Sequence, residues 1–138
     1  HLGEIVAAKV TSGNVHDTQP VSELAEHLPD KLYGDKGYLS KALAANLFDK
    51  GVTLITIVRK NMKAKAMSLW DRAMLSKRFI IETINDQLKN ISFIEHSRHR
   101  SVNGFMLNLL AGLVAYYLKK DKPSLNISDV ELNSVVVA

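Results

Sequence analysis

KLYGDKGYLSKALAANLFDKGVTLITIV, residues 31–58, contains two strand-like runs on either side of a segment with helical spacing. The first run, 31–34, is short and ends at a glycine, whereas the second, 52–58, is an almost unbroken series of apolar and β-branched residues. Such a series is typical of a strand that is buried on both faces. The order strand, helix, strand predicts an α/β fold with at least one parallel pair of strands.

The segment between these runs predicts a helix over residues 41–50. Ser40 precedes it as an N-cap residue, and Gly51 follows it as a C-terminal signal. We expect this helix to connect the two strands. The apolar residues expected on its shared face are Leu43, Leu47 and Phe48.

Four further segments have a predicted structure. Residues 5–11 predict a strand that ends at a turn signal, and residues 21–28 predict a helix between two prolines. Residues 69–91 predict one or two helices with an apolar stripe. Residues 102–118 are apolar but fall short of the about 20 residues that span a bilayer, and two Asn interrupt them, so we expect a buried core helix and no membrane partner. The stripe in 69–91 consists of Ile80, Ile84 and Leu88.

The composition is that of one soluble domain. The chain has 138 residues, of which 46% are hydrophobic and 23% charged, which is enough to bury a core. Cys is absent, which excludes disulfides and thiolate metal sites and favours a reducing cytoplasm, and no secretory signal is visible. We expect an ordered domain over residues 1–120 and a flexible tail over residues 121–138.

Positive charge is concentrated in residues 59–100. This block carries ten Lys and Arg against four Asp and Glu, whereas residues 1–58 carry five against seven. Clustered Lys and Arg indicate a polyanionic partner, because they replace the counterions condensed on phosphates. A solvated helix face is the alternative for a charge run of this kind. The basic residues are Arg59, Lys60, Lys63, Lys65, Arg72, Lys77, Arg78, Lys89, Arg98 and Arg100.

Two acidic residues lie where a metal site could form. Asp35 follows the first strand of the quoted stretch, and Glu82 lies within the predicted helical segment. On that helix the same face carries Arg78, Asp86 and Lys89. Two carboxylates on separate elements can hold divalent cations for phosphodiester chemistry, and Mg²⁺ needs only one or two of them besides water and phosphate. The alternative for Glu82 is a surface ion pair with the Arg four residues before it.

The spacing Arg78-x3-Glu82-x6-Lys89 resembles a signature of DDE transposases of bacterial insertion sequences, where it surrounds the last catalytic glutamate. The full signature begins with a Tyr three residues before the Arg. This chain has Leu75 at that position, so one of four elements departs from the pattern.

Two other segments carry the same resemblance. Residues 34–38, Gly-Asp-Lys-Gly-Tyr, resemble the segment with the second catalytic Asp of that family, and residues 11–17 resemble the stretch before it. The order and separation of the three segments also fit, so the resemblance covers roughly residues 1–118.

The resemblance implies an RNase H-like α/β fold, a mixed sheet with flanking helices that here lacks its first strand or strands. It implies a transposase that cuts and joins DNA with two Mg²⁺ ions, with insertion-sequence ends and target DNA as partners. Asp35 and Glu82 would be catalytic residues and metal ligands. A homodimer is compatible with it, as is a cytoplasmic, nucleoid-associated location. The residues expected at DNA are Arg78 and Lys89, which would also orient Glu82, and Arg98, Arg100, Lys60 and Lys63.

Members of the family carry a first catalytic Asp upstream of the segment that matches residues 11–17. The present chain begins at His1 without that Asp, so we expect a transposase fragment that is inactive alone. If it is active, Asp17 and Asp86 are the candidates for the third ligand. Two alternatives stay open: a non-catalytic DNA-binding remnant that uses the basic block, and a structural remnant without a partner.

Two smaller features complete the candidate residues. His96 and His99 lack a second ligand pair, so they are a weak metal signal. Trp70 lies among basic residues and is a candidate for stacking on a base, although a lone Trp more often packs in a core.

Overall fold

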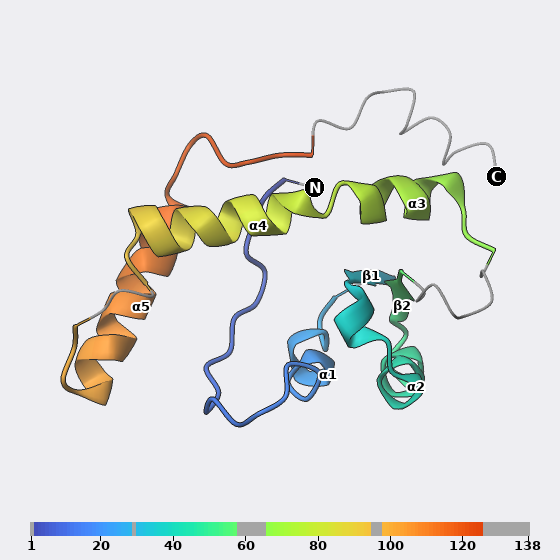
Figure 1. Ribbon diagram of the computed structural model, residues 1–138, viewed down its shortest axis with the longest axis horizontal. Helices are drawn as coiled ribbons and strands as arrows, with labels where there is room; N and C mark the ends of the chain where they lie inside the picture. Colours follow the sequence, from blue (N-terminus) through green and yellow to red (C-terminus); the bar gives the residue numbers. More distant parts are fainter. Residues whose placement is uncertain (1, 29, 58–65, 95–97, 126–138) are drawn as a thin grey trace. The chain divides into compact units, whose positions relative to one another are not determined.

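The computed structural model describes residues 2–28, 30–57, 66–94 and 98–125 (Figure 1). The chain divides into two compact units, which we call the sheet unit, Val6–Ser76, and the helical unit, His1–Ile5 with Lys77–Ala138.

The sheet unit is built on one parallel pair of strands. Strands β1 (Lys31–Gly34) and β2 (Thr53–Thr56) pair in register, Lys31 with Thr53 and Gly34 with Thr56. Helix α2 (Lys41–Asp49) connects them, as a parallel pair requires a crossover. The predicted α/β class and the predicted parallel pairing are therefore confirmed. The mixed sheet of an RNase H-like fold stays a prediction.

The two faces of β1 contact different helices. Leu32 packs with Leu54 of β2 against a core to which α2 and the residues around α1 (Val21–Leu24) contribute. On the other face Tyr33 hydrogen-bonds to a residue of α3 (Leu69–Ser76). This alternation follows from the two-residue period of a strand. The buried core residues are Ala25, Leu43, Leu47 and Val52.

Helix α2 begins at the predicted residue and ends at Asp49, one residue before the predicted end. The Ser40 side chain accepts a hydrogen bond from the backbone N–H of Leu43 (3.3 Å), and Gly51 takes a positive φ of 79° after the helix. The prediction that Phe48 shares the buried face is wrong: Leu47 is 0% exposed, whereas Phe48 is 73% exposed. Consecutive helical residues are rotated by about 100°, so Phe48 lies beside the face that Leu47 buries.

Three predicted elements of the sheet unit differ from the structure. Residues 5–11 have no regular secondary structure, and Val6 is 73% exposed. A β-rich run gains stability only where a neighbouring strand pairs with it, and none of the described strands pairs with this one. Helix α1 ends at Leu24, before the predicted end at residue 28. Strand β2 is half-buried because its sheet has two described strands, and residue 58 lies outside the described residues.

The helical unit contains α4 (Phe79–Asp86), its continuation η2 (Gln87–Ile91), which is one π-helical turn, and α5 (Val102–Tyr117). A turn at residues 77–78 separates α4 from α3, so the predicted stretch 69–91 forms two helices. The side chain of Ser101 caps α5 by accepting a hydrogen bond from the N–H of Gly104 (3.1 Å).

Helix α5 is not the buried core helix that its composition predicts. Its buried residues are Gly112 and Tyr116, whereas Leu107 is 70% exposed and Val114 56%. The buried stripe contacts residues 92–94, where Ile94 approaches Gly112, and the hydroxyl of Tyr116 donates to the carbonyl of Gly3 (2.6 Å). Other apolar residues of the helix, among them Leu110 and Tyr117, are exposed. Within that part of the chain, no helix has the length and apolar character needed to cross a membrane.

The chain between residues 121 and 125 packs on the helical unit. Leu125 is buried, and Lys122 donates to the carbonyl of Lys119 (3.0 Å). Residues 126–138 lie outside the described part, and the division predicted at residue 120 stays a prediction.

Candidate functional site

Asp35 lies directly after β1, at the carboxyl end of the parallel pair. Its carboxylate accepts a hydrogen bond from the backbone N–H of Lys36 (2.6 Å) and so caps the short 3-10 helix η1 (Lys36–Tyr38). Gly34 allows the close approach of η1, because a Cβ there would lie 3.3 Å from Cβ of Tyr38. The Asp35 side chain is exposed. In α/β sheets ligands bind outside the carboxyl ends of strands, so this carboxylate has the position of a ligand-binding group.

A second carboxylate, Asp71 of α3, lies against the same strand. Its Oδ1 accepts hydrogen bonds from Nζ of Lys31 (2.9 Å) and from the hydroxyl of Tyr33 (2.8 Å). Its Oδ2 accepts from the hydroxyl of Ser68 (2.7 Å), and that hydroxyl in turn accepts from the Asp71 N–H (3.0 Å). Asp71 is 7% exposed, so this buried carboxylate joins α3 to β1.

The electrostatics of this cluster follow from its burial and its donors. Burial alone would raise the pKa of Asp71, but hydrogen bonds from Lys31, Ser68 and Tyr33 outweigh it and lower that pKa below its ordinary value. The pKa of Tyr33 is raised, first by burial and then by its hydrogen bond to the Asp71 carboxylate, while a hydrogen bond from Trp70 acts in the opposite direction. The cluster is therefore stable as an anion held by a cation and a neutral phenol.

The sequence patterns considered above did not indicate Asp71. A signal was present, because Ser68-x-x-Asp71 ahead of a helix is a capping pattern. The contacts with Lys31 and Tyr33 join residues about 40 positions apart, and the local pattern carries no sign of them.

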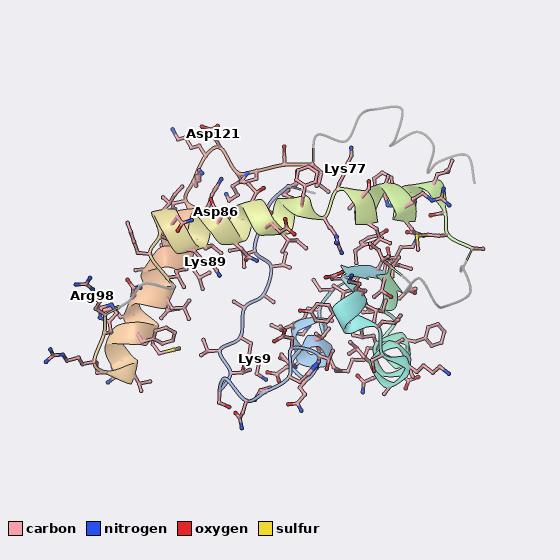
Figure 2. All side chains as sticks on the ribbon, in the orientation of Figure 1. Lys9, Lys77, Asp86, Lys89, Arg98 and Asp121 are labelled. Carbon is pink, nitrogen blue, oxygen red and sulfur yellow. The ribbon has the colours of Figure 1, made fainter. Side chains whose placement is uncertain are left out.

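Glu82 belongs to the helical unit. It lies in the first turn of α4 with an exposed side chain, Arg78 is the N-cap residue, and Lys89 lies in η2. Asp86 accepts a hydrogen bond from the Asn90 side chain (2.6 Å). Figure 2 labels Asp86 and Lys89 on the continuous helix that α4 and η2 form. Asp35 belongs to the sheet unit, whereas Glu82 belongs to the helical unit. That the two carboxylates hold the same metal ions therefore stays a prediction.

The other candidate residues lie on exposed segments or outside the described residues. Arg98 and Arg100 are exposed just before α5, and Figure 2 labels Arg98 there. His99 between them is also exposed, as is Asp17 in the sheet unit. Trp70, in α3, is half-buried. Residues that lie outside the described part are Lys60, Lys63 and His96.

No group of three or more His, Asp or Glu that could hold a metal occurs in the described ranges. An open groove of about 500 Å³ lies between η2 and α5, but Asp and Glu are absent from its lining. Its polar walls include Gln87, Asn108 and Lys119, of which Lys119 donates to Gln87 (2.8 Å). The groove therefore lacks the carboxylates that a divalent cation needs.

A parallel strand-helix-strand unit with a carboxylate at the strand end defines an α/β domain, a class in which ligands generally bind at the carboxyl end of the sheet. Comparison with known families identifies it further: the family described as Transposase DDE domain matches residues 1–102. The chain belongs to this family. No curated protein and no solved structure matches it. The match bears out the sequence-based resemblance to DDE transposases and a transposase-related function.

Proposed function

We propose that this domain serves the metal-dependent cutting and joining of DNA strands in transposition, on an RNase H-like fold. The observation that carries the proposal is the position of Asp35, an exposed carboxylate at the carboxyl end of β1 within a segment that the transposase family matches. Glu82 is the second carboxylate, on the exposed first turn of α4.

The donor chemistry of these two residues suits Mg²⁺. Both offer carboxylate oxygens, which are hard ligands, and both side chains are exposed, so a hydrated ion can approach. Mg²⁺ bound there would supply charge stabilisation at phosphate oxygens and an activated attacking oxygen. In this proposal Asp35 and Glu82 hold the ions, and Arg78 and Lys89 orient Glu82 and contact phosphate.

Binding of DNA rests on the basic block. Arg98 and Arg100 are exposed on the segment that leads into α5, where they can reach a phosphate backbone, and Lys60 and Lys63 belong to the same charged block of the sequence. DNA that carries insertion-sequence ends is the proposed partner, and a homodimer is compatible with this function.

Metal binding is tested by titrating the isotope-labelled chain with Mn²⁺ and following paramagnetic broadening of amide resonances. We expect broadening centred on residues 36–37 and on α4, and its loss at residues 36–37 in Asp35→Asn. Glu23→Gln is the matched control, because Glu23 forms an ion pair with Lys9 on the surface of the same unit. If Asp35→Asn broadens like the unchanged chain, Asp35 is not a metal ligand.

DNA binding is tested by a salt titration with duplex DNA. Replacing Arg98 and Arg100 by Gln should weaken binding and reduce the slope of log K against log salt by about 0.9 for each lost phosphate contact. Lys9→Gln with Lys41→Gln removes the same charge from exposed positions of the sheet unit and should leave the slope unchanged. An equal slope in all three proteins would make the basic block ordinary surface.

The two alternatives give different results in the same assays. A non-catalytic DNA-binding remnant would bind DNA without Mg²⁺, and Asp35→Asn would leave that binding intact. A structural remnant would bind neither Mn²⁺ nor DNA.

A further inference from the structure

Strand β1 is held from both faces, and the two faces are held by different chemistry. On one face Leu32 packs into the apolar core with α2. On the other face Lys31 and Tyr33 both donate to one oxygen of Asp71. Because side chains alternate along a strand, Asp35 comes two residues after Tyr33 at the end of this second series. The strand end that carries Asp35 is thus continuous with the residues that Asp71 holds.

Asp71 itself has no room for a metal ion. Its Oδ1 accepts from Lys31 and Tyr33, its Oδ2 accepts from Ser68, and the residue is 7% exposed. A hydrated Mg²⁺ keeps several of its waters and needs an accessible oxygen, so it would have to displace the Lys31 ammonium. Asp71 is therefore a structural carboxylate and not the third ligand.

A buried carboxylate with three donors is sensitive to the loss of its charge. If Asp71 is neutralised, Lys31 loses its partner, and the donors of Tyr33 and Ser68 face a weaker acceptor. Residues that act on a metal ligand through such contacts typically change metal affinity without touching the metal.

We propose that Asp71 is a positioning residue for Asp35: by holding Lys31 and Tyr33 it fixes the end of β1, and with it the direction of the Asp35 carboxylate. This inference rests on the proposed function, in which Asp35 holds the cation. The contacts within the cluster stand independently of that function.

The test compares three variants of the full chain by two-dimensional NMR. Asp71→Asn keeps the shape of the side chain and removes its charge, and Tyr33→Phe removes one hydrogen bond from the same cluster. Glu23→Gln is the control, because it neutralises an exposed carboxylate in an ion pair of the same unit. The first measurement is made without metal and gives the chemical shift of the Lys36 amide, which donates a hydrogen bond to the Asp35 carboxylate. The second reading is the Mn²⁺ concentration that half-broadens the signals of residues 36–37.

We expect Asp71→Asn to move the Lys36 resonance toward its position in the urea-unfolded chain and to weaken Mn²⁺ binding by about 10- to 100-fold. Tyr33→Phe should cause a smaller change in the same direction, and Glu23→Gln none. If circular dichroism shows that Asp71→Asn is unfolded, Tyr33→Phe decides by the same two readings.

Unchanged Lys36 resonance and Mn²⁺ binding in a folded Asp71→Asn, or in Tyr33→Phe where that variant decides, would overturn the proposal. Failure of the proposed function has a different signature, because Asp35→Asn would then leave Mn²⁺ binding intact. In that case the Lys36 resonance, which needs no metal, decides alone whether Asp71 positions Asp35.

Discussion

Replacing Leu47 by Ala should destabilise the sheet unit far more than replacing its neighbour Phe48. Leu47 is 0% exposed in the core with Ala25, Leu43 and Val52, whereas Phe48 is 73% exposed on the same helix. A fully buried Leu→Ala change costs about 2–5 kcal/mol, and a change at an exposed position costs about 0.5 kcal/mol or less. A loss of about 3 kcal/mol at a denaturant slope of about 1.5 kcal/mol per molar lowers the urea midpoint by about 2 M.

The chain provides a convenient probe for this measurement. It has one Trp, Trp70, which lies in α3 of the sheet unit, so fluorescence in a urea titration reports on that unit. Leu47→Ala should shift the midpoint strongly, and Phe48→Ala should leave it nearly unchanged. Equal shifts would refute the reasoning, because they would place Phe48 in the core and rotate α2 about its axis.

Other predictions concern both units. The raised pKa of Tyr33, caused by burial and then by its hydrogen bond to a carboxylate, gives stability that is complete below its ordinary pKa of about 10 and is lost as pH rises through the folded value. Tyr33→Phe should therefore flatten the alkaline decline of the urea midpoint above about pH 10. Gly112→Ala should destabilise the helical unit by about 1–3 kcal/mol in thermal circular dichroism, because its Cβ would lie 2.7 Å from Cγ1 of Ile94, and Ile94→Ala in the same chain should relieve part of that cost. Tyr116→Phe leaves the buried carbonyl of Gly3 without its donor and should cost about 1–3 kcal/mol in the same measurement; a cost near zero would mean that water replaces the hydroxyl.

The parts of the fold that local signals encode were predictable from the sequence. Ser40 and Gly51 mark the ends of α2 because capping and positive φ depend on residues at the helix ends themselves. The parallel pair followed from the order strand, helix, strand in the sequence. The prediction of a strand over residues 5–11 is wrong because a strand is stable only when another strand pairs with it. The β-propensity of a segment carries no information about that partner.

Errors of burial have a related cause. The apolar composition of α5 predicts a buried core helix, but the structure buries only a narrow stripe of it, at Gly112 and Tyr116. The reason is that few described elements of its unit are available to cover the other faces. The position of Asp35 at a strand end was predictable, since strand and motif coincide in the sequence. Asp71 was not, because its partners Lys31 and Tyr33 meet it only through the packing of α3 on β1.

The two proposed catalytic carboxylates depend on their surroundings in different ways. Asp35 follows a strand that is fixed by an apolar core on one face and by the Asp71 cluster on the other. Substitutions in the core or in the cluster can therefore displace Asp35, even where the substituted residue contacts neither metal nor DNA. Glu82 extends from the exposed first turn of α4, so its position depends mainly on its own side chain and that helix. Within the sheet unit the proposed role of Asp35 therefore depends on how β1 is held, and this makes Asp71 the most informative residue of that unit to change after Asp35 itself.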